Sequence, residues 1–200
     1  MNIKRLVGAS ALLFAITATS ANATSVTASG PSAVDIGQQI VIELQGDFVG
    51  VGMNGGGLDF TWDDALVSLD SVTLDVPNDP ALSCGGASTN ANCPADTSTT
   101  TRVAWGTFGS PPVIVSSSDP AGIVMATLTF TALAGGNAAF SMADAGLGWL
   151  NEAFSPVATP DFLNTSVTIN AGVVPVPAAV WLFGSGLIGL VGMARRRKAA

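Results

Sequence analysis

The sequence predicts an all-β domain, and three observations lead to this fold class. Short segments alternate apolar and polar residues, which is the period of a strand with one buried face. Stretches rich in Gly, Ser, Thr, Asn and Pro separate these segments, as turns and loops do. Between residues 24 and 172, no stretch has helical periodicity beyond one turn near residues 63–67. We therefore expect residues 24–172 to form a β-sandwich.

About seven to nine short strands are expected, which is enough for two packed sheets. In the clearest of them, every second residue from Val124 to Phe130 is apolar. In another, Leu58, Phe60 and Trp62 share one face. The segments that alternate, or that fill the intervals between alternating ones, are 39–44, 58–62, 72–76, 102–105, 124–131, 137–142 and 166–169.

Residues 1–23 have the three parts of a secretory signal peptide. Lys4 and Arg5 form the basic start, an apolar stretch follows, and Ala21 and Ala23 form a small-x-small cleavage site. Cleavage there releases the body outside the cytoplasm. An uncleaved membrane anchor is the alternative.

Residues 173–200 form a second targeting segment. Pro175, Val176 and Pro177 predict a turn, because proline lacks a backbone donor and disfavours helix in the residue before it. The apolar residues 178–194 follow. As a helix they would span about 26 Å, the short end of what crosses a bilayer.

Four basic residues end this apolar segment: Arg195, Arg196, Arg197 and Lys198. By the positive-inside rule they form a cytoplasmic stop, which leaves the body outside the inner membrane. This orientation agrees with the signal peptide. Physical chemistry alone leaves a plain single-span membrane protein as an alternative.

The string VPVPAAVWLFGSGLIGLVGMARRRK, from Val174 to Lys198, resembles the PEP-CTERM sorting signal. That family occurs in Gram-negative bacteria that make exopolysaccharide and biofilm. The resemblance implies that an exosortase, a membrane-embedded cysteine transpeptidase-like enzyme, recognises and cleaves the tail. Val176 stands where the family commonly has Glu, which implies a variant class of sorting enzyme.

The body is strongly acidic. All fourteen acidic residues lie between Asp35 and Asp161, and Arg102 is the one basic residue of the body, so its formal charge is −13. Such a domain is repelled by nucleic acid and stays soluble. The chain has no His, which removes the usual general base and the commonest metal ligand. We therefore expect no hydrolase triad, no zinc site and no cofactor.

Cys84 and Cys93 are the only cysteines, and both lie in a stretch rich in Gly, Asn and Pro. In an exported chain such a pair predicts a disulfide. Closing so short a loop would stabilise the fold by about 2–3 kcal/mol in the chain-entropy model. Two thiols without His make a metal site the weaker interpretation.

Several carboxylates in the middle of the chain suggest calcium or catalysis as alternatives. Asp59, Asp63, Asp64 and Asp70 carry suitable oxygen ligands, but their spacing matches no EF-hand loop. Pairs of carboxylates also serve glycosidases, yet acidic pairs are abundant here by composition alone. We expect solvated carboxylates, no metal and no catalytic residues.

Two stretches of the body resemble the cohesin-like sandwich family. Residues 57–72, GLDFTWDDALVSLDSV, are similar to a strand that ends in an Asp-containing turn before a new strand begins. Residues 34–42, VDIGQQIVI, are similar to the opening of that family, a Gly turn followed by an alternating strand. The resemblance implies a jelly-roll sandwich used for binding or architecture. Cohesins bind dockerins, but the sequence has no interface motif to carry across.

These features predict an exported protein with no catalytic activity, sorted by an exosortase to the cell surface or the exopolysaccharide matrix of a Gram-negative bacterium. Expected partners are the exosortase, the membrane, and exopolysaccharide or another surface protein. The alternative is a carbohydrate- or protein-binding module that stays anchored by its C-terminal helix. That alternative predicts exposed tryptophans on the body, where Trp62, Trp105 and Trp149 are the candidates.

Overall fold

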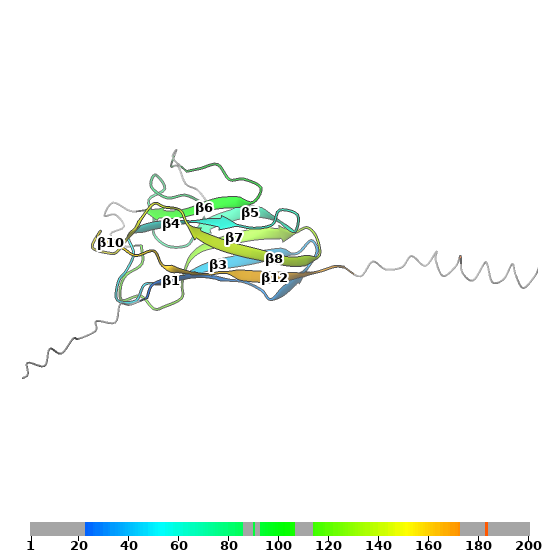
Figure 1. Ribbon diagram of the computed structural model, residues 1–200, viewed down its shortest axis with the longest axis horizontal. Coiled ribbons are helices and arrows are strands. Elements are labelled where there is room, and N and C mark those ends of the chain that lie inside the picture. Colours follow the sequence, from blue (N-terminus) through cyan, green and yellow to red (C-terminus); the bar gives the residue numbers. More distant parts are fainter. Residues whose placement is uncertain (1–22, 86–89, 91–92, 107–113, 173–182, 184–200) are drawn as a thin grey trace, which may run out of the picture.

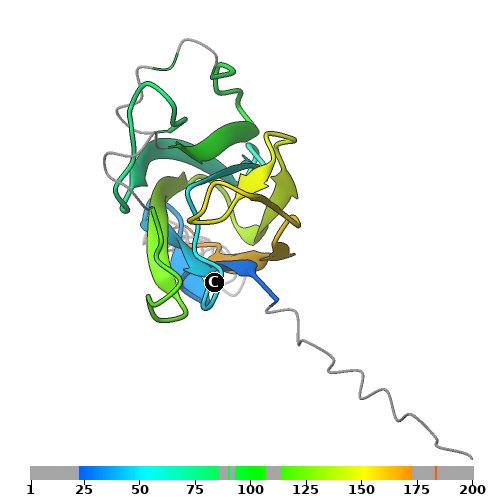
Figure 2. The same ribbon diagram turned by 90° about the vertical axis from the view of Figure 1, so that its left-hand side faces the viewer.

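Two β-sheets packed face to face form the body of the protein, as the computed structural model in Figure 1 shows. The structure describes residues 23–85, 90, 93–106, 114–172 and 183. A view turned by 90° looks toward one end of the sandwich, where the strands of the two sheets surround a shared interior (Figure 2). The all-β sandwich predicted from the alternating segments is confirmed.

The first sheet has five strands in the order β11-β1-β3-β7-β5. They are β1 (Ser25–Ser29), β3 (Gln39–Asp47), β5 (Val67–Leu74), β7 (Ile123–Ala132) and β11 (Asp161–Leu163). β3 and β7 pair antiparallel along most of their length. Both alternate apolar and polar residues, so each buries one face and exposes the other.

The second sheet has seven strands in the order β10-β9-β4-β8-β12-β2, and β6 pairs with β4 off this path. They are β2 (Ala33–Asp35), β4 (Gly55–Thr61), β6 (Thr100–Gly106), β8 (Gly136–Asp144), β9 (Trp149–Leu150), β10 (Pro156–Val157) and β12 (Thr165–Asn170). β4 pairs with β6 along its whole length, and with β8 and β9 on its other side.

The two ends of the body lie side by side and cross from one sheet to the other. β1 runs parallel to β11 in the first sheet, and β2 runs parallel to β12 in the second. Asn164 stands at the crossing between β11 and β12, where its side-chain oxygen accepts the Met142 N–H at 2.8 Å. β12 ends at the opposite end of the sandwich from β10 (Figure 1).

Aromatic rings from both sheets fill the centre of the core. Phe60 of β4, Phe130 of β7 and Phe140 of β8 are fully buried. Their ring centroids lie 4.9–6.1 Å apart. Rings at such distances stabilise a core beyond the area that they bury. The two sheets are therefore joined by direct aromatic packing.

Each of the seven expected segments overlaps a strand, and the largest difference concerns β5, which begins at Val67 and not at Val72. Asp63 explains the early start. Its carbonyl accepts the N–H groups of Leu66 and Val67 at 3.1 Å, and its carboxylate accepts the Ala65 N–H at 3.0 Å. This single turn, predicted near residues 63–67, leads directly into the strand.

The two predicted targeting segments lie almost wholly outside the described residues. These include Lys4, Arg5 and Ala21 of the signal peptide, as well as Pro175, Val176, Pro177 and residues 195–198 of the tail. Ala23 is described and is exposed. Within the described ranges, no helix has the length and apolar character needed to cross a bilayer.

Candidate binding face on the second sheet

β4 opens with three consecutive glycines, which shape both of its faces: Gly55, Gly56 and Gly57. On the inner face, a Cβ at Gly56 would overlap the indole of Trp149. On the outer face, a Cβ at Gly57 would lie 2.9 Å from Ala104 Cβ and 2.9 Å from Leu147 Cδ1. Glycine therefore lets a buried tryptophan and an exposed leucine both contact the backbone of one strand.

These glycines border a hollow of about 300 Å³ on the second sheet. Its apolar lining comes from several segments: Leu82, Ala104, Leu147, Leu150 and Phe154. Leu147 is 56% exposed and Phe154 is 45% exposed. Large apolar side chains that are exposed around a concavity are typical of a binding site. We call this hollow and its rim the apolar hollow.

Phe154 is held at the rim by an unusual backbone conformation. Its φ angle is 57°, the one positive value at a described residue other than glycine. Asn151 supports this turn, because its side-chain oxygen accepts the N–H groups of Ala153 and Ser155 at 3.0 and 2.9 Å. A bulky residue in this region is strained, and such strain is concentrated at functional sites.

Asn54 fastens the same turn to the sheet and lines the apolar hollow. It is 1% exposed, and its Nδ2 donates to the Glu152 carbonyl at 2.7 Å. Its Oδ1 is buried and has no hydrogen-bond partner among the residues that the structure describes. A buried acceptor without a donor is costly, so this turn carries an energetic cost beside the apolar hollow.

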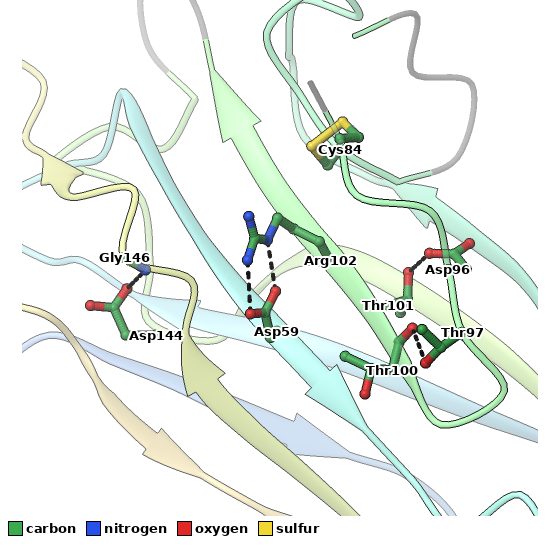
Figure 3. Close-up of polar contacts among 10 residues, drawn as sticks. Asp59, Cys84, Asp96, Thr97, Thr100, Thr101, Arg102, Asp144 and Gly146 are labelled. Atoms are coloured by element: carbon green, nitrogen blue, oxygen red, sulfur yellow. Dashed lines mark hydrogen bonds and ion pairs between the residues drawn. A yellow bond between two sulfur atoms is a disulfide. The ribbon is translucent and has the colours of Figure 1, made fainter. Parts of the chain in front are cut away.

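The one basic residue of the body is paired beside the apolar hollow. Asp59 of β4 and Arg102 of β6 are direct cross-strand partners. Two hydrogen bonds join their side chains, from Nε at 2.7 Å and from Nη2 at 2.9 Å (Figure 3). The hydrogen bond to Asp59 raises the pKa of the Arg102 guanidinium, more than burial lowers it. Asp59 therefore compensates the charge of Arg102.

An isolated β-bridge and a disulfide hold the loop before β6. Cys84 and Ala104 exchange backbone hydrogen bonds of 2.9 and 3.0 Å. Cys84 and Cys93 form the predicted disulfide, with a Cα–Cα distance of 5.6 Å. Thr101 and Asp96 add a side-chain hydrogen bond (Figure 3). The loop beside the apolar hollow is thus fastened at several points.

The carboxylates considered for calcium do not converge on one point. Asp59 binds Arg102, Asp63 accepts from the turn that it starts, and Asp70 accepts the Thr131 hydroxyl at 2.7 Å. In the described part of the chain, no three His, Cys, Asp or Glu side chains are close enough to hold a metal together. Asp59, Asp63 and Asp70 thus serve local structure with three separate partners, and Asp64 is exposed.

The tryptophans considered for carbohydrate binding lie in the interior. Trp62, Trp105 and Trp149 are 6%, 2% and 2% exposed. Trp105 Nε1 donates to the Met125 carbonyl at 3.1 Å, and the ring of Trp149 lies against Phe48, with centroids 6.1 Å apart. These three rings therefore offer no exposed platform for a sugar.

The residues of the apolar hollow were not predicted from the sequence. Leu147 and Phe154 are single apolar residues between turn-forming neighbours, and Asn54 is an ordinary loop residue by its type. One signal was present, the glycine run directly before an alternating segment. Glycine inside a strand marks a close approach by other groups, and three in succession indicate contacts on both faces.

Comparison with known proteins gives a likeness in structure alone. No model of a known protein family matches the chain, and no curated protein matches it. Twenty-one chains of known structure match. The third cohesin of ScaC from Acetivibrio cellulolyticus, solved with the ScaB dockerin, has a TM-score of 0.56 at 12% identity. The match covers 74% of this chain and 99% of that one.

Two other cohesins match in the same way. A type II cohesin domain from the Acetivibrio cellulolyticus cellulosome has a TM-score of 0.53 at 8% identity, over 72% of this chain and 95% of its own. CaCohA2 from Clostridium acetobutylicum has a TM-score of 0.51 at 13% identity, over 76% and 94%. The cohesin-like fold predicted from residues 34–42 and 57–72 is confirmed.

Proposed function

We propose that this protein is an exported binding module, with no catalytic activity of its own, that holds a protein partner against the apolar hollow. The observation that carries the proposal is this concavity, with Leu147 and Phe154 exposed at its rim. The ScaC cohesin, a sandwich of similar fold, was solved in complex with a dockerin. Apolar anchors seated in pockets supply most of the affinity at protein interfaces.

Delivery to the cell surface is the second half of the proposal. Residues 173–200 would be recognised by an exosortase at Pro175, Val176 and Pro177, with residues 195–198 as the cytoplasmic stop. The disulfide supports an oxidising compartment. β12 ends at the far end of the sandwich from β10 (Figure 1), and the apolar hollow includes Leu150 of β9, which pairs with β10. Before the tail is cleaved, a body held by it would therefore present the apolar hollow away from the membrane.

The binding half is tested by site-specific photo-crosslinking on the exported full chain. A photoreactive residue replaces Phe154, or replaces Val41 as a control. Val41 lies on the outer face of the first sheet and is 42% exposed, close to the 45% of Phe154. We expect one discrete adduct from position 154, which is lost when L147D is added, and none from position 41. Equal adducts from both positions, or none from position 154, contradict the proposal.

The sorting half is tested by the intact mass of the exported protein from cells with and without the exosortase. We expect residues 178–200 to be absent from the product only when the enzyme is present. Retention of these residues in both strains contradicts sorting and supports the alternative of a permanently anchored binding module. The crosslinking result is independent of this outcome.

A further inference from the structure

Among the strands that the structure describes, β5 has a neighbour on one side only. It pairs with β7, and it is the last strand in the sheet order. A groove of about 940 Å³ lies beside it, and its lining includes all six residues from 67 to 72. Successive residues of a strand point to opposite faces, so a groove that contacts all of them follows the edge of the strand. At such an edge the backbone presents unpaired donors and acceptors.

The opposite wall of this edge groove is residues 93–98. The Cys84–Cys93 disulfide and the hydrogen bond between Thr101 and Asp96 hold this wall in place. Six residues at about 3.3 Å each give the edge groove a length of about 20 Å, which is the length of an ordinary strand. It can therefore take one further extended segment.

Part of the lining of the edge groove is apolar. Trp62, Val67, Leu69 and Val72 contribute to its lining. Trp62 Nε1 is buried without a hydrogen-bond partner among the described residues. A buried indole N–H ordinarily has an acceptor.

Charge indicates what kind of segment fits. Three carboxylates and one cation line the edge groove: Asp64, Asp70, Asp96 and Arg102. Because Arg102 is paired with Asp59, the carboxylates still dominate the charge of the groove. The register between β5 and β7 also shifts at Asp70. Carboxylates on an edge strand repel a second copy of the same strand, and they attract a chain with basic side chains.

We propose that the edge groove binds an extended, basic segment of a partner protein, which adds a strand to the first sheet beside β5. In such a segment, alternate side chains point toward the apolar part of the lining and are apolar. The others point outward beside Asp70 and are Lys or Arg. This inference goes beyond the proposed function, because the edge of the first sheet can be filled whether or not the apolar hollow binds a partner.

The probe is a fluorescent eight-residue peptide of alternating Val and Lys, mixed with the full chain in detergent micelles. We expect saturable binding by fluorescence anisotropy, and slower hydrogen exchange of backbone amides within β5. The same peptide with Glu in place of Lys should not bind. Protection outside the edge groove, with β5 unchanged, overturns the proposal. Slower exchange in β5 through self-association without peptide also overturns it, because the occupant is then a second copy.

Two matched variants separate the edge groove from general attraction to an acidic protein. Asp70 and Asp75 are both exposed, and each accepts the hydroxyl of a β7 threonine at 2.7 Å. Only Asp70 is part of the lining of the edge groove. We expect D70N to weaken peptide binding about three- to fivefold, and D75N less than about twofold. Equal weakening by both variants overturns the proposal.

Discussion

The outer face along β5 and β7 of the first sheet differs from the outer face beside β4 and β6 of the second. On the first sheet, Thr127, Thr129 and Thr131 follow one another along β7, all half-buried. Asp75 and Asp70 accept the hydroxyls of the first and third at 2.7 Å. Two of the three threonine hydroxyls are therefore satisfied by carboxylates in β5 or directly after it. On the second sheet, glycine and short side chains leave space that exposed apolar side chains border.

This difference explains why the candidate site lies on the second sheet, where glycine and short side chains leave space on the outer face. The hydroxyls and carboxylates along β5 and β7 give a partner little apolar area to bury there. The apolar hollow gives it a concavity with Leu147 and the strained Phe154 exposed at the rim. The same sandwich thus carries one face suited to water and one suited to contact.

The largest expected effect on stability comes from removing the Cys84–Cys93 disulfide, which lies beside the second sheet. The double variant C84A/C93A should lower the free energy of unfolding by about 2–3 kcal/mol, because the unfolded chain regains the freedom of a short loop. Denaturant titration of the full chain, followed by tryptophan fluorescence, measures this loss. A reductant should destabilise the wild type by a similar amount and leave the variant unchanged. Equal stability of all samples would show that the disulfide is dispensable.

Much of the fold follows from local pattern, and the exceptions are informative. β3 and β7 were predicted because buried and more exposed residues alternate along β3 and along β7 from Ala126 onward. β1, β2 and β11 were not, because they are short and rich in Ser, Ala or Asp. Parallel pairing with strands from the other end of the chain helps to define these strands. Pairing over such distances leaves no local signal.

The candidate site was harder to predict for a related reason. The disulfide follows from two cysteines in one exported loop. The apolar hollow depends on Trp149 and Leu147 meeting β4 across about ninety residues of chain. By type, Gly55 to Gly57 indicate a loop, since glycine is depleted in strands. Only the packing of both faces explains why these glycines open a strand.

A second prediction compares Gly56, which contacts a buried side chain of the core, with its neighbour Gly55. G56A places a methyl group where the Trp149 indole lies, and overpacking of this kind costs about 1–3 kcal/mol. G55A is the control, because a Cβ there meets its nearest atoms at ordinary contact distances of 3.6 and 3.7 Å. Its stability should stay within about 0.5 kcal/mol of wild type. If denaturant midpoints show equal losses, the two glycines do not differ in the way that the packing requires.

The smallest expected effect concerns the ion pair on the second face. D59N removes the carboxylate partner of Arg102 on a partly exposed strand pair, so the free energy of unfolding should fall by less than about 1 kcal/mol. Removing one negative charge from an acidic body also relieves repulsion. D64N serves as the control for that relief, because exposed Asp64 is not the partner of Arg102.

The quantity to follow is the difference in the free energy of unfolding between D59N and D64N. Its dependence on salt and pH distinguishes a specific ion pair from general charge effects. Added salt should shrink it, because screening weakens partly exposed charges. The pair raises the pKa of Arg102, so its stabilisation is fully present below the ordinary pKa of arginine and is lost only above the raised value. The difference should therefore stay constant between about pH 6 and pH 9. A difference that fades over this range would show that a group other than Arg102 determines it.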